Sequence, residues 1–157
     1  MSPEIRDMTQ IVSQHPMFED FSDEHKELIA GCASNARFNP GELLLREGEP
    51  SEKFYLIRYG KVSLEVYSAA QGRITIQTYD EGDIVGWSWI VSPYRYKHDA
   101  RARSLTRTLE FDGACLRGKA ESDPAFGYAL LKKFAPLIVQ SLERVELQLL
   151  DVYGHDR

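Results

Sequence analysis

Between residues 41 and 112 the sequence consists of short runs of alternating apolar and polar side chains, which repeated turn signals interrupt. In the run 62–67, for example, Val62, Leu64 and Val66 fall on one face, and Ser63, Glu65 and Tyr67 fall on the other. A glycine follows soon after each of the runs, and no long helical pattern separates them. Because period-two alternation at such spacing is typical of antiparallel strands, this region predicts a sandwich or barrel.

Helical patterns lie on both sides of the strand region. Ser2, followed by proline and glutamate, has the features of a helix start, and residues 22–24 announce a second short helix. Asp123 and the proline after it predict the start of a C-terminal helix, with a kink or a break at Pro136. We therefore predict a single domain over residues 1–157, with N-terminal helices at 1–36, a β-roll at 37–112 and C-terminal helices at 113–157.

The C-terminal helix carries apolar residues at alternating spacings of four and three. The positions are Leu131, Ala135, Ile138, Leu142, Val145, Leu149 and Val152. Such a seam predicts a coiled-coil contact between two copies of the chain, and hence a homodimer. The alternative is a helix that packs on its own barrel, which Leu137 and Leu150 favour by widening the stripe.

Composition narrows the classes of function and location. The net charge of −5 argues against non-specific binding to nucleic acid, and no apolar run is long enough to span a membrane. The N-terminus has no secretory signal pattern, so we expect a cytoplasmic protein. Cys32 and Cys115 share no metal-binding or redox spacing and are expected to be reduced thiols. With four scattered histidines, no metal site is expected.

Several segments, in this order and spacing, resemble the cyclic nucleotide-binding domain of the catabolite activator and fumarate–nitrate regulator superfamily. They are residues 15–18, 41–44, 47–49, 54–57, 60–62 and 82–86, followed by the long terminal helix. The resemblance covers nearly the whole chain. It implies a mainly β fold with flanking helices, a double-stranded β-helix of about eight strands of the jelly-roll or cupin type. It also implies a ligand pocket inside the roll and dimerisation along the last helix. Many relatives carry a helix-turn-helix domain after that helix, but we expect none here, because the sequence ends at Arg157, a few residues past the seam.

The phosphate-binding segment departs from the family pattern. Where the family has a glutamate after the glycine equivalent to Gly86, this sequence has Trp87. The positions of the family's arginine and of its hydroxyl residue fall on Tyr96 and Lys97, with Arg95 one residue away. Because hydrogen bonds to a charged group contribute about 1.5–3 kcal/mol each, these changes predict weak or no binding of cyclic AMP and cyclic GMP.

We call this segment the cassette. Its candidate ligand-binding residues are Val85, Gly86, Trp87, Ser88, Trp89, Arg95, Tyr96 and Lys97. Two interpretations of its aromatic residues stay open: they close the pocket as core residues, or they line it and stack on a planar anionic ligand. Pleat alternation places Ala100 and Ala102 inside the roll and predicts that Arg101 and Arg103 are mainly surface residues.

The leading functional hypothesis is a non-enzymatic regulatory or sensor module that signals through a dimer helix to an unknown downstream protein. No cofactor is assigned, although a cyclic nucleotide or another small anionic ligand fits the resemblance. One alternative is a true cyclic nucleotide-binding protein, or a truncated transcription regulator that contacts DNA only through a partner. A minor alternative is a cupin-type enzyme, but the clustered histidine and glutamate ligands of such sites are missing from the sequence.

Overall fold

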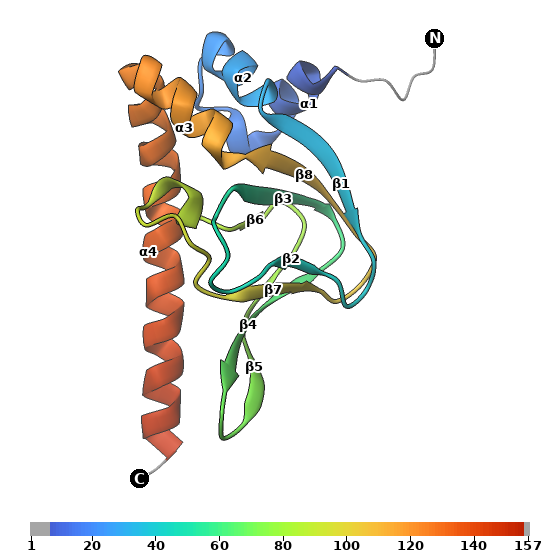
Figure 1. Cartoon of the computed structure of the whole chain (residues 1–157), viewed down its shortest axis with the longest axis vertical. Helices are drawn as coiled ribbons and strands as arrows, with labels where there is room; N and C mark the ends of the chain where they lie inside the picture. Colours follow the sequence, from blue (N-terminus) through green and yellow to red (C-terminus); the bar gives the residue numbers. More distant parts are fainter. Residues whose placement is uncertain (1–6, 156–157) are drawn as a thin grey trace.

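Eight strands form two four-stranded sheets that face each other as a roll (Figure 1). The computed structural model describes residues 7–155, and for residues 145, 148, 149 and 152–155 it describes the backbone alone. The helix-side sheet has the order β1 (Ala33–Phe38), β8 (Thr106–Asp112), β3 (Lys53–Tyr59), β6 (Ile84–Val85). The outer sheet has the order β2 (Leu43–Leu45), β7 (Asp99–Ala102), β4 (Val62–Ser68), β5 (Gly72–Tyr79). The predicted fold class is confirmed.

Helices cover the helix-side sheet and one flank of the roll. They are α1 (Met8–Gln14), the 3₁₀ turn η1 (Pro16–Phe18), α2 (Asp23–Ala30), α3 (Gly113–Ser122) and α4 (Pro124–His155). The first three α-helices gather at one end of the molecule, while α4 runs along its side past the β4–β5 hairpin (Figure 1). Within the described range of the chain, no helix combines the length and hydropathy that crossing a membrane requires.

Two of these helices begin at the capping residues that the sequence indicated. Ser22 accepts a hydrogen bond from the His25 amide at the start of α2, and Asp123 accepts one from the Phe126 amide at the start of α4. The predicted helix start at Ser2 lies outside the described residues. The described part of α1 begins after Asp7, whose carboxylate accepts a hydrogen bond from the amide two residues later.

Two hydrophobic cores lie on the two faces of the helix-side sheet. One packs that sheet against the helices and includes Phe54, Trp89, Phe111, Phe126 and Phe134. The other fills the inside of the roll with residues from both sheets, among them Leu45, Tyr55, Val62, Tyr96 and Ala100. Alternation along β3 explains the division, because neighbouring residues of a strand point to opposite faces.

Two sequence-based expectations need correction. Strand β1 begins at Ala33, inside the segment that was assigned to N-terminal helices, because pairing with β8 sets Ala33 opposite Phe111. Of the kink or break expected at Pro136, the break is wrong, because α4 continues through this residue. The missing proline N–H removes one backbone hydrogen bond, and apolar packing on both sides of that turn keeps Phe134 and Leu137 against the core.

Cys32 and Cys115 form a disulfide, whereas the sequence analysis expected reduced thiols. Cys32 directly precedes β1 and Cys115 lies in the first turn of α3, and the β1–β8 pairing brings their Cα atoms to 5.9 Å. A separation of 83 residues gives no local signal of this contact.

Reduction of this disulfide is expected to lower the free energy of unfolding by about 2–4 kcal/mol, since the bond closes a long loop in the unfolded chain. Urea unfolding with and without a reducing agent measures the difference. The matched control is the Cys32→Ser/Cys115→Ser double variant, whose stability should not respond to the reductant. Equal stability of the oxidised and reduced wild type would contradict this role.

Candidate functional site

Gly86 follows the short strand β6 and adopts a left-handed backbone with φ of +96°, which glycine reaches without the strain that a Cβ atom would cause. A Cβ atom at this position would lie 3.6 Å from the Lys53 carbonyl oxygen and 3.5 Å from the Phe54 Cβ. Val85, before it, is fully buried inside the roll. Gly82 also has positive φ, but its amide donates to the Ile57 carbonyl and is not directed at a ligand.

The residues after Gly86 turn toward the helices instead of the roll interior. Ser88 and Trp89 form part of a 3₁₀ turn, η2 (Ser88–Ile90), and Trp89 is 0% exposed. Its ring stacks on Phe54 with centroids 4.8 Å apart and meets Phe134 of α4 edge-on at 5.0 Å. Trp89 is therefore a core residue on the helix side of the sheet, and it neither lines nor fills the roll interior. Trp87 is half-buried at the margin of the same core.

Gly113, the first residue of α3, makes the position of Trp89 possible. A Cβ atom at Gly113 would lie 2.7 Å from the Trp89 Cβ and 3.2 Å from the Glu52 carbonyl oxygen. Since neither neighbour is the end of a flexible side chain, a larger residue would force the turn away from α3. The close contact explains why a glycine begins this helix.

Tyr96 is the cassette residue that enters the roll. Its side chain is 8% exposed and belongs to the interior core, together with Val85. The phenol oxygen accepts a hydrogen bond of 3.0 Å from the Lys53 amide and donates one of 2.8 Å to the Lys53 carbonyl. Burial raises the pKa of Tyr96, so the phenol stays neutral at physiological pH. Gly86 and Tyr96 thus meet at the same backbone group of β3.

Arg95 and Lys97 lie at the surface on either side of Tyr96. The Arg95 guanidinium donates to the Gly48 carbonyl at 2.9 Å, and its backbone pairs with Pro50 in the turn before β3. The backbone next to Arg95 is held at the same turn, because the Ser51 amide donates to the Tyr94 carbonyl at 2.7 Å. The structure therefore brings Val85, Gly86 and Tyr96 together and leaves both cations on the rim.

Arg117 of α3 is a structural contact of the cassette that the sequence analysis missed. Its guanidinium lies 4.4 Å from the centre of the Tyr94 ring and donates to the carbonyls of Trp89 and Ser51. Tyr94 itself has φ of +58°, which is uncommon for a residue other than glycine. Arg117 thus fastens the cassette to α3. A lone arginine on a helix gives no sequence signal of such a contact.

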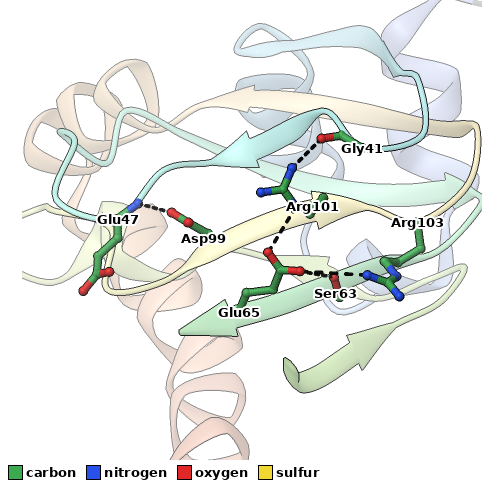
Figure 2. A network of polar contacts seen from close by, with 7 residues as sticks. All are labelled: Gly41, Glu47, Ser63, Glu65, Asp99, Arg101 and Arg103. Atoms are coloured by element: carbon green, nitrogen blue, oxygen red, sulfur yellow. Dashed lines mark hydrogen bonds and ion pairs between the residues drawn. The ribbon is translucent and has the colours of Figure 1, made fainter. Parts of the chain in front are cut away.

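Within the outer sheet, a charged network ties β7, the strand after the cassette, to β4 and to the turn at Gly41 (Figure 2). The Glu65 side chain is only 6% exposed and accepts a hydrogen bond of 3.1 Å from Arg101 Nε. Arg101 also donates to the Gly41 carbonyl at 2.7 Å, and Arg103 Nη1 lies 3.9 Å from the second Glu65 oxygen. Near the other end of β7, Asp99 accepts from the Glu47 amide at 2.7 Å.

This network corrects the prediction for Arg101. Ala100 and Ala102 are 0% exposed inside the roll, as predicted, and Arg101 points to the opposite face. However, its side chain is 18% exposed because Glu65 and the turn at Gly41 cover it, whereas that of Arg103 is 57% exposed. Pleat alternation gave the correct direction for both arginines but not the cover over one of them.

A small hollow of about 50 Å³ lies between the cassette turn and α4. Gly86 and Trp87 line it from one side, and Ser141 and Arg144 of α4 from the other. Tyr79 of β5 also lines it, and burial raises the pKa of this tyrosine to about 12. The volume of this hollow suits one or two water molecules but not a nucleotide, which needs a site of about 300 Å³ or more.

Comparisons with known proteins identify the family. A putative cyclic nucleotide-binding protein from Geobacter metallireducens is 27% identical, with 85% of this chain and 97% of that one covered, at a TM-score of 0.76. A cyclic nucleotide-binding-like protein from Brucella abortus is 26% identical, with 74% and 99% covered, at a TM-score of 0.59.

The sensor domain of a transcriptional regulator from Pseudomonas aeruginosa shares the fold at 18% identity, with 86% and 91% covered and a TM-score of 0.67. No curated protein matches at a significant level. The cyclic nucleotide-binding domain pattern itself matches residues 36–123, more than half of the sequence. The chain therefore belongs to the cyclic nucleotide-binding domain family.

Proposed function

We propose that this chain is a non-enzymatic regulatory module whose roll is closed to cyclic nucleotides. The observation that carries the proposal is Tyr96, which lies inside the roll and bonds both backbone groups of Lys53. A nucleotide phosphate at this position would displace the phenol and leave the Lys53 carbonyl unpaired, at a cost of about 1–3 kcal/mol, because a phosphate can accept from the Lys53 amide but cannot donate to the carbonyl. The Arg95 guanidinium does not offset this loss, since it contacts the Gly48 carbonyl on the rim.

The cassette and the long helix share a core, which gives the module a route for a signal. Trp89 of the cassette and Phe134 of α4 pack edge to face, and Phe54 of β3 contacts both rings. A displacement of the cassette would therefore change how α4 packs against the helix-side sheet. Close packing supports this coupling because interiors respond to small displacements by rearrangement.

The free face of α4 supports a homodimer as the signalling form. Tyr128, Leu131, Val139 and Leu142 are all more than half exposed, and Ala135 between them is exposed as well. Such an apolar stripe on one helix is typical of a protein contact. The side chains of Val145, Leu149 and Val152 lie outside the described residues, so their part in the seam stays a prediction. A downstream protein would receive the signal from this dimer.

A small anionic ligand at the rim of the cassette is a second candidate. Arg95 and Lys97 are both exposed and flank the residue that enters the roll, and Trp87 is half-exposed beside Gly86. These residues offer charge and a partly accessible indole without requiring space inside the roll. Val85, Ser88 and Trp89, which are buried, would then support the turn but not contact the ligand.

Isothermal titration calorimetry of the wild type with cyclic AMP and cyclic GMP is expected to show no binding with a dissociation constant below about 10 μM. The reason is the loss of the family's glutamate and arginine together with the occupation of the roll by Tyr96. The thermal midpoint of unfolding should also stay constant when either nucleotide is added, because a ligand that binds raises it. Tight binding of either nucleotide would favour the alternative of a true cyclic nucleotide-binding protein.

A further inference from the structure

Three arginines occupy neighbouring strands of the helix-side sheet. Arg37 of β1 and Arg107 of β8 are directly paired in the antiparallel register. Arg58 lies on β3, which pairs with the other edge of β8. It stands at a register shift, because Ile57 pairs with Thr108 and Tyr59 already pairs with Arg107. All three side chains are exposed. Because adjacent strands are about 4.8 Å apart, the three guanidinium groups can reach one shared point.

None of the ion pairs between described residues includes these arginines. That is unexpected in a chain with 24 acidic and 19 basic residues. Like charges directly opposite each other on two strands also destabilise a sheet. The positive field extends to His15, where burial and the charge of Arg58 lower the pKa. Glu81 lines a neighbouring depression together with Arg58 and His15, but it does not line the hollow of the three arginines.

The three arginines line an open hollow of about 530 Å³. Asn35 and Tyr59 line it as well and supply an amide and a phenol for hydrogen bonds. The volume is within the usual range for small-molecule sites, which is about 300–1,000 Å³. A groove for an extended acidic peptide would need a longer track of cations. The hollow has no residue in common with the cassette.

We propose that this hollow binds a small molecule through a phosphate or diphosphate group. Guanidinium groups bind phosphate oxygens in pairs of parallel hydrogen bonds, and a dianion offsets the repulsion between Arg37 and Arg107. The site lies on the helix-side sheet, separate from the cassette, so it does not depend on whether the roll is closed. A ligand here would add an input to the regulatory module.

Calorimetry of the full chain with inorganic pyrophosphate tests the proposal. We expect wild-type binding at moderate ionic strength, and Arg107→Ala and Arg37→Ala should each weaken it by about 10- to 100-fold. Arg107→Lys should weaken it too, because an ammonium group keeps the charge but not the paired geometry. The matched control is Arg73→Ala, which removes an exposed arginine from β5 and should bind like the wild type.

Several outcomes would overturn the proposal. They are no wild-type binding at about 1 mM pyrophosphate, an equal loss in Arg73→Ala, or full retention in Arg107→Ala. Binding of a polyglutamate peptide in preference to pyrophosphate would overturn it in favour of an acidic protein partner. Thermal unfolding of each variant checks its fold, and removal of a like charge from the β1–β8 pair should not lower the midpoint.

Discussion

Replacement of Trp89 by alanine is expected to lower the free energy of unfolding by about 3–5 kcal/mol. The indole is fully buried between Phe54 and Phe134, so its removal leaves a cavity where the cassette, the sheet and α4 meet. In a chain of 157 residues this loss corresponds to a fall in the thermal midpoint of about 10 °C. Chemical denaturation followed by circular dichroism gives the free energy directly.

The control for this experiment is Trp87→Ala. Trp87 is the neighbouring indole of the cassette but is only half-buried, so its loss should have a clearly smaller effect. Trp89→Phe should fall in between, because it keeps an aromatic ring and removes a buried Nε1 that has no hydrogen-bond partner among the described residues. Equal effects of the two alanine variants would mean that Trp89 does not anchor the cassette to α4.

Leu142→Glu is expected to convert a dimer into a monomer. Leu142 is 60% exposed on α4, so glutamate there should not disturb the fold of one chain, but it would place a charge in the seam between two chains. An unpaired charge in an apolar interface is costly, and we expect the dissociation constant to rise by at least about 100-fold. Multi-angle light scattering at micromolar concentration measures the mass.

Tyr67→Glu provides the matched control, since it makes a similar apolar-to-acid change at a residue that is 72% exposed on the β4–β5 hairpin. This variant should keep the dimer. Leu131→Glu, which lies on the same free face of α4, should behave like Leu142→Glu. A wild type that is monomeric at micromolar concentration, or a dimer that survives both changes in α4, would show that the seam has been misinterpreted.

The strand region was predictable because its information is local. The alternation at residues 62–67 corresponds to β4, and the turn signal after it corresponds to the hairpin that joins β4 to β5. Strand β1 was not predictable in this way, because it contains no β-branched residue and only Phe38 is large and apolar. Its extended conformation depends on pairing with β8, some seventy residues later in the chain.

The arrangement of the cassette depended on contacts that no local pattern encodes. The left-handed backbone of Gly86 was predictable, because glycine is the residue that adopts it without strain. Which face Trp89 would occupy was not, since that depends on Phe134, on the gap left by Gly113 and on Arg117 of α3. The Cys32–Cys115 bond was missed for the same reason, as its partners meet only through the β1–β8 pairing.

A crystal structure grown with cyclic AMP at about 1 mM tests most directly whether the roll is closed. The account predicts that the Tyr96 ring stays between the two sheets with its hydroxyl on both backbone groups of Lys53, and that no nucleotide lies beside Gly86. A nucleotide seated in the roll, with Tyr96 displaced and Arg95 turned from Gly48 toward the phosphate, would contradict it.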